Sequence, residues 1–208
     1  MVYVSGYHVN IGVYQTLSGK KDLILSDQFN HASIIDGIWL SHAKKIVFKH
    51  NDLDDLERLL KKNKGRYAKI FVVTEGVFSM EGDIPDLQWL VKICWKFKAF
   101  IIIDDCHGVG ILGKTGRGAL EHCGLTMNDI DLLVSTLGKG LGGGSGGYCA
   151  GKFEVIKFLN QRSWSDIFSS TLGPGTVNGA RWCLRYIKEH PEMFDSHQKL
   201  IKRFWFGM

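Results

Sequence analysis

A lysine in a glycine-rich segment is the first candidate for chemistry. Lys139 lies in the segment 135–147, directly after the apolar run 131–134. A primary amine at a strand end, among residues too small to block a planar ring, is what a Schiff-base lysine requires. Thr136, three residues earlier, offers a hydroxyl to a phosphate group. On general grounds a lysine in such a segment is a solvated loop residue, so this pattern needs a second signal.

A carboxylate and an imidazole supply that signal. The apolar run 100–103 leads into Asp104, and His107 follows three positions later. An ionised carboxylate can keep a pyridine nitrogen protonated, which makes the ring an electron sink. Asp104 and Lys139 both fall at carboxyl ends of predicted strands, where open α/β sheets bind ligands. The pair, in this order, predicts pyridoxal phosphate. The alternative interpretations are a loop cap for Asp104 and a core histidine for His107.

The segment 108–115 is a competing signal, because it matches the phosphate-loop pattern G-x-x-x-x-G-K-[ST]. A phosphate loop must open directly into a helix whose first amides hold the phosphates. Here Gly116 and Gly118 follow Lys114 at once, and glycine is a poor residue for a first helical turn. A nucleotide-binding phosphate-loop protein is therefore only a remote alternative.

Composition limits the remaining classes. The chain has 208 residues, 45% hydrophobic and 23% charged, with a net charge of +5 spread along its length. These values are typical of a soluble globular protein, and the dispersed lysines do not indicate nucleic-acid binding. Five cysteines without CxxC spacing predict neither a disulfide framework nor a metal site. With no signal peptide and no membrane span in the sequence, we expect a cytoplasmic protein, or a mitochondrial-matrix protein if the true N-terminus is missing.

Apolar runs alternate with helical periodicities along the chain. This alternation predicts an α/β fold with a largely parallel sheet covered on both faces. Strands are predicted at 23–25, 45–48, 68–74, 99–104, 131–135 and 147–150, with a strand-like pair at Ile167-Phe168. Helices are predicted over 31–40, 52–60, 87–97, 152–159 and 176–187.

Four segments together resemble one enzyme family. The segments 30–37, 74–83, 104–118 and 135–148 closely resemble those of the α-oxoamine synthases. Members of this family are pyridoxal-phosphate enzymes of fold type I that condense an amino acid with an acyl-coenzyme A. The resemblance implies a three-layer α/β/α arrangement like the large domain of aspartate aminotransferase.

The resemblance also implies roles for individual residues. Lys139 would hold the cofactor, Asp104 its pyridinium nitrogen and His107 its ring oxygen. His31 would stack on the ring. The alternative interpretation is that His31 is only a polar residue at the start of a helix. The remaining positions are the phosphate-side turn Gly6-Tyr7 with Thr136, Ser79 beside the cofactor, and Ser169 and Ser170, which would reach the phosphate of a neighbouring subunit. The last role implies a homodimer.

Within the family, the motifs are most similar to those of glycine C-acetyltransferases. This implies condensation of glycine with acetyl-coenzyme A to 2-amino-3-oxobutyrate and coenzyme A. Serine palmitoyltransferase and 8-amino-7-oxononanoate synthase activities are the alternatives. Family members are much longer, so we expect residues 1–208 to be the cofactor-binding large domain, without the family's N-terminal segment or its C-terminal small domain. The arginine that binds the substrate carboxylate would then be missing, and a non-catalytic remnant is a further alternative.

Overall fold

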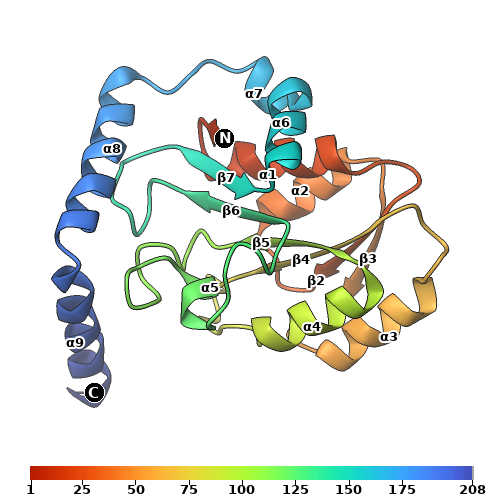
Figure 1. Ribbon diagram of the computed structural model, residues 1–208, viewed down its shortest axis with the longest axis horizontal. Coiled ribbons are helices and arrows are strands. Elements are labelled where there is room, and N and C mark those ends of the chain that lie inside the picture. Colours follow the sequence, from red (N-terminus) through yellow and green to blue (C-terminus); the bar gives the residue numbers. More distant parts are fainter. Residues whose placement is uncertain (208) are drawn as a thin grey trace.

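Seven strands form a single sheet in the computed structural model, which describes residues 1–207 (Figure 1). The strands lie in the order β1-β7-β6-β5-β4-β2-β3. They are β1 (Val2–Tyr3), β2 (Leu23–Asp27), β3 (Lys44–Phe48), β4 (Ile70–Glu75), β5 (Phe100–Asp104), β6 (Leu132–Thr136) and β7 (Gly147–Gly151). Strands β2 to β6 are parallel to one another, whereas β7 is antiparallel to both β6 and β1. The predicted, largely parallel sheet is confirmed.

Helices cover both faces of this sheet. On one face lie α1 (Gly6–Leu17), α2 (Ala32–Leu40) and α6 (Phe153–Arg162), and on the other lie α3 (Leu53–Asn63) and α4 (Leu87–Phe97) (Figure 1). The remaining helices are α5 (Ala119–His122), α7 (Trp164–Ile167), α8 (Pro174–Glu189) and α9 (Glu192–Gly207). None of the helices within residues 1–207 is long and apolar enough to cross a membrane.

Coverage of both faces explains why the central strands contain continuous apolar runs before their polar ends. In β5, Ile101 and Ile103 pack under α3 and α4, whereas Ile102 packs under α1 and α2. Successive strand residues point to opposite faces, so a sheet covered on both sides favours apolar residues at consecutive positions. Each face of the sheet thus has its own buried cluster.

The topology places a crevice above the carboxyl ends of the strands. Strands β2 and β4 are neighbours, and the connection after β2 leads to β3 on one side whereas the connection after β4 leads to β5 on the other. In parallel sheets, ligands bind outside the carboxyl ends at such a switch point. The ends of β2, β4, β5 and β6 all border this crevice, and they carry or precede the candidate site residues.

Two local predictions are wrong. Gly6 and Tyr7 do not form a turn, because they are the first two residues of α1, a helix that the sequence pattern did not reveal. Its β-branched and glycine residues are weak helix formers, but Val9 and Val13 are fully buried against the sheet and tertiary packing prevails. Ile167 ends the short helix α7 and is not in a strand.

Candidate active site

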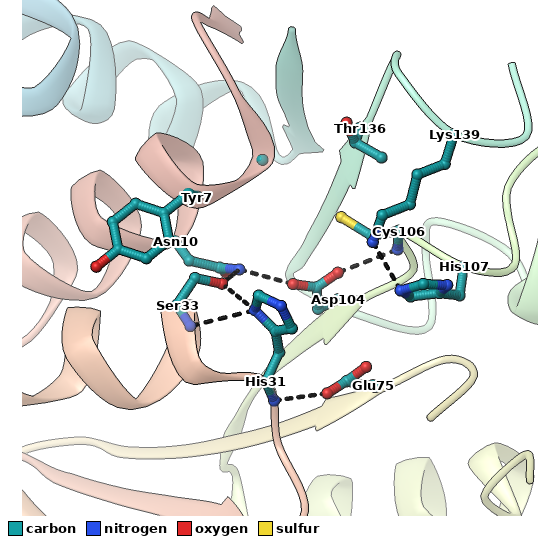
Figure 2. Close-up of a pocket in the computed structure, with 11 residues that line it drawn as sticks. Tyr7, Asn10, His31, Ser33, Glu75, Asp104, Cys106, His107, Thr136 and Lys139 are labelled. Carbon is teal, nitrogen blue, oxygen red and sulfur yellow. Dashed lines mark hydrogen bonds between the residues drawn. The ribbon is translucent and has the colours of Figure 1, made fainter. Parts of the chain in front are cut away.

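A pocket of about 200 Å³ lies at the carboxyl ends of the strands (Figure 2). Seven of the residues predicted from the sequence line it: Gly6, Tyr7, His31, Asp104, His107, Thr136 and Lys139. Asn10, Ser33, Glu75 and Cys106 complete the lining. The structure therefore brings together groups from distant parts of the sequence, including the lysine and the carboxylate on which the cofactor prediction depends.

Asp104 lies deep in the pocket as the last residue of β5. Its carboxylate is buried and accepts two hydrogen bonds, from Asn10 Nδ2 over 2.7 Å and from the backbone N–H of Cys106 over 3.0 Å. Both donors are uncharged, and such donors stabilise an ionised carboxylate. The arrangement suits a carboxylate that faces a protonated ring nitrogen.

Lys139 and His107 come together in the same pocket. The Lys139 Nζ atom lies 2.6 Å from His107 Nε2 (Figure 2). Burial lowers the pKa of His107, and the charge of Lys139 lowers it further. A neutral imidazole can therefore accept a hydrogen bond from the lysine ammonium.

His31 is held at the N-terminus of α2, where its side chain caps the helix. Its backbone N–H donates to Glu75 Oε1 over 2.6 Å, and its ring Nδ1 accepts from the backbone N–H of Ser33 over 3.2 Å. Burial, and second the charge of the nearby Asp104, raise the pKa of Glu75 to about 8. A protonated Glu75 would limit the negative charge gathered around Asp104.

The polar groups of this pocket fit pyridoxal phosphate. First-turn amides of a helix have no intrahelical partner and favour phosphate, and Gly6 and Tyr7 occupy the first turn of α1. The Thr136 hydroxyl donates to the backbone oxygen of Gly146 over 2.8 Å, so it must rotate to donate to a phosphate. With Asp104 for a ring nitrogen and Lys139 for an aldehyde, each end of the cofactor has a counterpart.

Three predicted residues lie outside this pocket. Ser79 is exposed in the loop between β4 and α4. That loop is fastened by His50, whose two ring nitrogens pair with Asp27 Oδ1 over 2.8 Å and Asp83 Oδ2 over 2.9 Å. Ser169 and Ser170 line a separate cavity of about 440 Å³ beside β1. Within this single chain they do not reach the pocket.

Four lining residues escaped the sequence-based prediction. Asn10 is one helical turn beyond Gly6, so it could have been found only if α1 had been predicted. Glu75 is paired in register with Asp104 at the ends of β4 and β5. Its position after the apolar run 70–74 was a signal of the kind that identified Asp104. Ser33 and Cys106 lie beside predicted residues, but nothing in their spacing indicates chemistry.

The phosphate-loop match at 108–115 has no phosphate-loop structure. Residues 109–118 form turns and bends closed by a β-bridge between Val109 and Arg117, and the following α5 begins only at Ala119. The loop folds around the buried Asp105, which accepts a hydrogen bond from the backbone N–H of Ala119 over 2.8 Å. A Cβ atom at Gly108 or Gly118 would lie 2.0 Å from an Asp105 carboxylate oxygen. The glycines of this loop leave room for the Asp105 carboxylate and do not form a phosphate-binding loop.

Known proteins with related sequences identify the family. Residues 1–208 match aminotransferase class I and II. The chain belongs to this family. It is 46% identical over 202 residues to a putative 8-amino-7-oxononanoate synthase of Methanocaldococcus jannaschii, covering 97% of this chain and 54% of that protein. It is 40% identical over 206 residues to the 2-amino-3-ketobutyrate coenzyme A ligase of Escherichia coli K12, covering 99% of this chain and 50% of that protein.

Solved structures agree with the family assignment. A serine palmitoyltransferase structure described with a PLP internal aldimine superposes with a TM-score of 0.89 at 32% identity, covering 96% of this chain and 49% of that one. The resemblance to α-oxoamine synthases of fold type I is thereby confirmed, and pyridoxal phosphate is the cofactor that the family and its solved members support. The chain spans about half the length of the curated relatives it matches.

Proposed function

We propose that the protein is a pyridoxal-phosphate-dependent acyltransferase that joins an amino acid to an acyl thioester. The observation that carries the proposal is the pocket itself, in which Lys139, His107, Asp104 and His31 converge. The family match and the relatives' names support the same class of reaction. Residues 1–208 would form the cofactor-binding large domain.

Each residue has a proposed role toward the cofactor. When bound, pyridoxal phosphate supplies an aldehyde for an amino group and a ring that withdraws electrons from the amino acid's α-carbon. Lys139 Nζ would hold the aldehyde carbon and later move the α-proton. Asp104 would hold the proton at the ring nitrogen and His107 would donate to the ring oxygen. The His31 ring would cover one face of the cofactor and exclude water from it.

The phosphate would lie at the first turn of α1. Gly6 and Tyr7 would present backbone N–H groups, and Thr136 a hydroxyl. Ser79 would approach the cofactor only after a movement of its loop. Ser169 and Ser170, which line another cavity, would reach the phosphate of a second subunit in a homodimer.

Glycine and acetyl-coenzyme A are the substrates that we propose first. We base this choice on the similarity of the sequence motifs to those of glycine C-acetyltransferases. The Escherichia coli relative named 2-amino-3-ketobutyrate coenzyme A ligase supports it. A second candidate is 8-amino-7-oxononanoate synthesis, which the 46% identical relative favours. The two products differ in that the first retains the amino acid's carboxylate, whereas the second has a methyl group next to its amino carbon.

Cofactor binding and proton exchange test the proposal in the chain as it is. Titration with pyridoxal phosphate should produce a visible absorbance band, and addition of glycine should change that band. In deuterated water, the bound chain should exchange the α-proton of glycine, and comparison with alanine would separate the two candidate substrates. A chain that acquires no band at saturating pyridoxal phosphate would contradict the proposal.

A further inference from the structure

A chain of hydrogen bonds joins the carboxylate of Asp104 to the imidazole of His31 (Figure 2). Asn10 Nδ2 donates to Asp104 Oδ2 over 2.7 Å and to Ser33 Oγ over 2.9 Å. Ser33 Oγ in turn lies 2.7 Å from His31 Nδ1. We propose that Asn10 is a positioning residue that fixes Asp104 and His31 relative to each other through Ser33. The proposal rests on the proposed function, because it concerns how these two groups receive pyridoxal phosphate.

The chemistry of the partners sets the direction of each hydrogen bond. An ionised carboxylate only accepts, so the amide nitrogen of Asn10 must face Asp104, and its second hydrogen points to Ser33. The Ser33 hydroxyl accepts this bond and keeps its own hydrogen to donate to His31 Nδ1. The backbone N–H of Ser33 also donates to Nδ1, over 3.2 Å. Nδ1 is therefore an acceptor, and the ring hydrogen is on Nε2.

Burial makes this arrangement rigid. Asn10 is 1% exposed, Ser33 2% and Asp104 4%, so water does not compete for the bonds between them. The second oxygen of Asp104 is held by the backbone N–H of Cys106 over 3.0 Å. The carboxylate cannot rotate without losing a donor on one side or the other. Its orientation is consequently set before a ligand arrives, which is the condition for electrostatic preorganisation.

The position of Asn10 on α1 connects the two ends of the pocket. Gly6 and Tyr7 begin this helix at the proposed phosphate end, and Asn10 follows one turn later. The helix is thus anchored to Asp104 and, through Ser33, to α2. A displacement of α1 would move the phosphate-side amides and the carboxylate's donor together.

The amide also has a cost that a purely structural residue would avoid. The Asn10 Oδ1 atom is buried and has no hydrogen-bond partner in the part of the chain that the structure describes. An unsatisfied buried acceptor destabilises the fold. The amide is explained by its two N–H donors, which an apolar side chain of the same size would not provide.

A pair of asparagine variants tests the proposal. Asn63 is a matched control, since it is 4% exposed on α3 and its Nδ2 donates to the backbone oxygen of Leu59 over 2.8 Å, away from the pocket. Pyridoxal phosphate affinity would be measured by absorbance titration, together with the pH midpoint of the visible cofactor band. Asn10→Ala should weaken affinity by at least about tenfold and shift that midpoint, because the partner of a buried charge is lost. Asn63→Ala should lower stability to unfolding without either effect.

The outcomes separate this inference from the proposed function. If the wild-type chain binds the cofactor and Asn10→Ala matches Asn63→Ala in affinity and pH midpoint, Asn10 is only structural and the inference is overturned. If the wild-type chain binds no pyridoxal phosphate, the proposed function itself fails.

A second pair at Ser33 tests the link to His31 should Asn10→Ala fail to fold. Ser33→Ala removes the hydroxyl that donates to His31 Nδ1, whereas Ser33→Thr keeps it. Circular dichroism in the cofactor band reports how the bound ring is held. Ser33→Ala should change this signal and Ser33→Thr should restore it. A wild-type signal in Ser33→Ala would show that the link does not position His31.

Discussion

Lys139 Nζ and His107 Nε2 lie 2.6 Å apart, which requires one of the two nitrogens to accept a hydrogen bond. His107 is the acceptor, because burial and then the charge of Lys139 lower its pKa from the usual 6.5. Replacing the lysine by an apolar residue removes the second of these causes. In the cofactor-free chain, Lys139→Met should therefore raise the pKa of His107 toward its usual value.

Nuclear magnetic resonance titration of the histidine ring protons would measure this pKa. Lys114→Met serves as the control, since Lys114 is exposed in the 108–118 loop. An unchanged His107 pKa in Lys139→Met would mean that the two side chains do not interact in solution.

Glu75 makes stability depend on pH. Its pKa is raised from 4.5 to about 8, chiefly by burial, so the folded state keeps a proton that the unfolded state releases above about 4.5. The unfolded state then binds fewer protons, and the free energy of unfolding falls as the pH rises from about 4.5 to 8. Glu75→Gln retains an oxygen for the His31 N–H and cannot ionise. Its stability relative to wild type should grow across this interval and level off above it.

Urea unfolding at several pH values between 4.5 and 8 checks this expectation. Glu81→Gln, an exposed substitution in the following loop, corrects for the loss of one charge. If the stability difference between Glu75→Gln and wild type stays constant with pH, the pKa of Glu75 is not raised in the folded state and the prediction is wrong.

Asp104→Asn should separate cofactor binding from proton removal. The variant should still bind pyridoxal phosphate, but a neutral amide cannot hold the proton at the ring nitrogen. Exchange of the glycine α-proton into deuterated water should fall by at least about a hundredfold. Asp105→Asn is the control, because Asp105 is also buried but does not line the pocket. Undiminished exchange in Asp104→Asn would rule out its role.

The proposed contact of Ser169 and Ser170 with the phosphate of another subunit predicts that the chain self-associates. They lie away from the pocket of their own chain, so contact with a phosphate would require a second subunit. A ligand bound between two chains stabilises their association by linkage. Sedimentation should show more dimer with pyridoxal phosphate than without it, and less of this effect in a chain carrying Ser169→Ala and Ser170→Ala. A monomer that binds the cofactor tightly would contradict the shared site.

The sheet could be predicted because its sequence signals are local. The strands from β2 to β6 are apolar runs, and α3 shows a leucine stripe at Leu56, Leu59 and Leu60 that is buried in the structure. Helix α1 could not be predicted, because its residues have weak helix propensity and the helix is stabilised by burial of Val9 and Val13. Ile167, apolar and next to Phe168, resembled a strand but ends a single helical turn.

In the site, too, residues with a local sequence signal could be predicted, whereas residues placed by tertiary packing could not. Asp104 and Thr136 end strands β5 and β6, so the strand pattern alone places them at one edge of the sheet. Asn10 reaches Asp104 across 94 positions of sequence, a contact that only the packing of α1 creates. Ser79 was predicted to lie beside the cofactor, but the structure places it on an exposed loop outside the pocket.

The attachment of the cofactor to Lys139 is the central claim, and chemical labelling tests it most directly. The chain would be saturated with pyridoxal phosphate, reduced with borohydride and digested, and the modified peptide would be identified by mass spectrometry. Because Lys139 lines the pocket with Asp104 and His107, the pyridoxyl group should be found on Lys139. A label on Lys114 of the 108–118 loop, with Lys139 unmodified, would contradict the account.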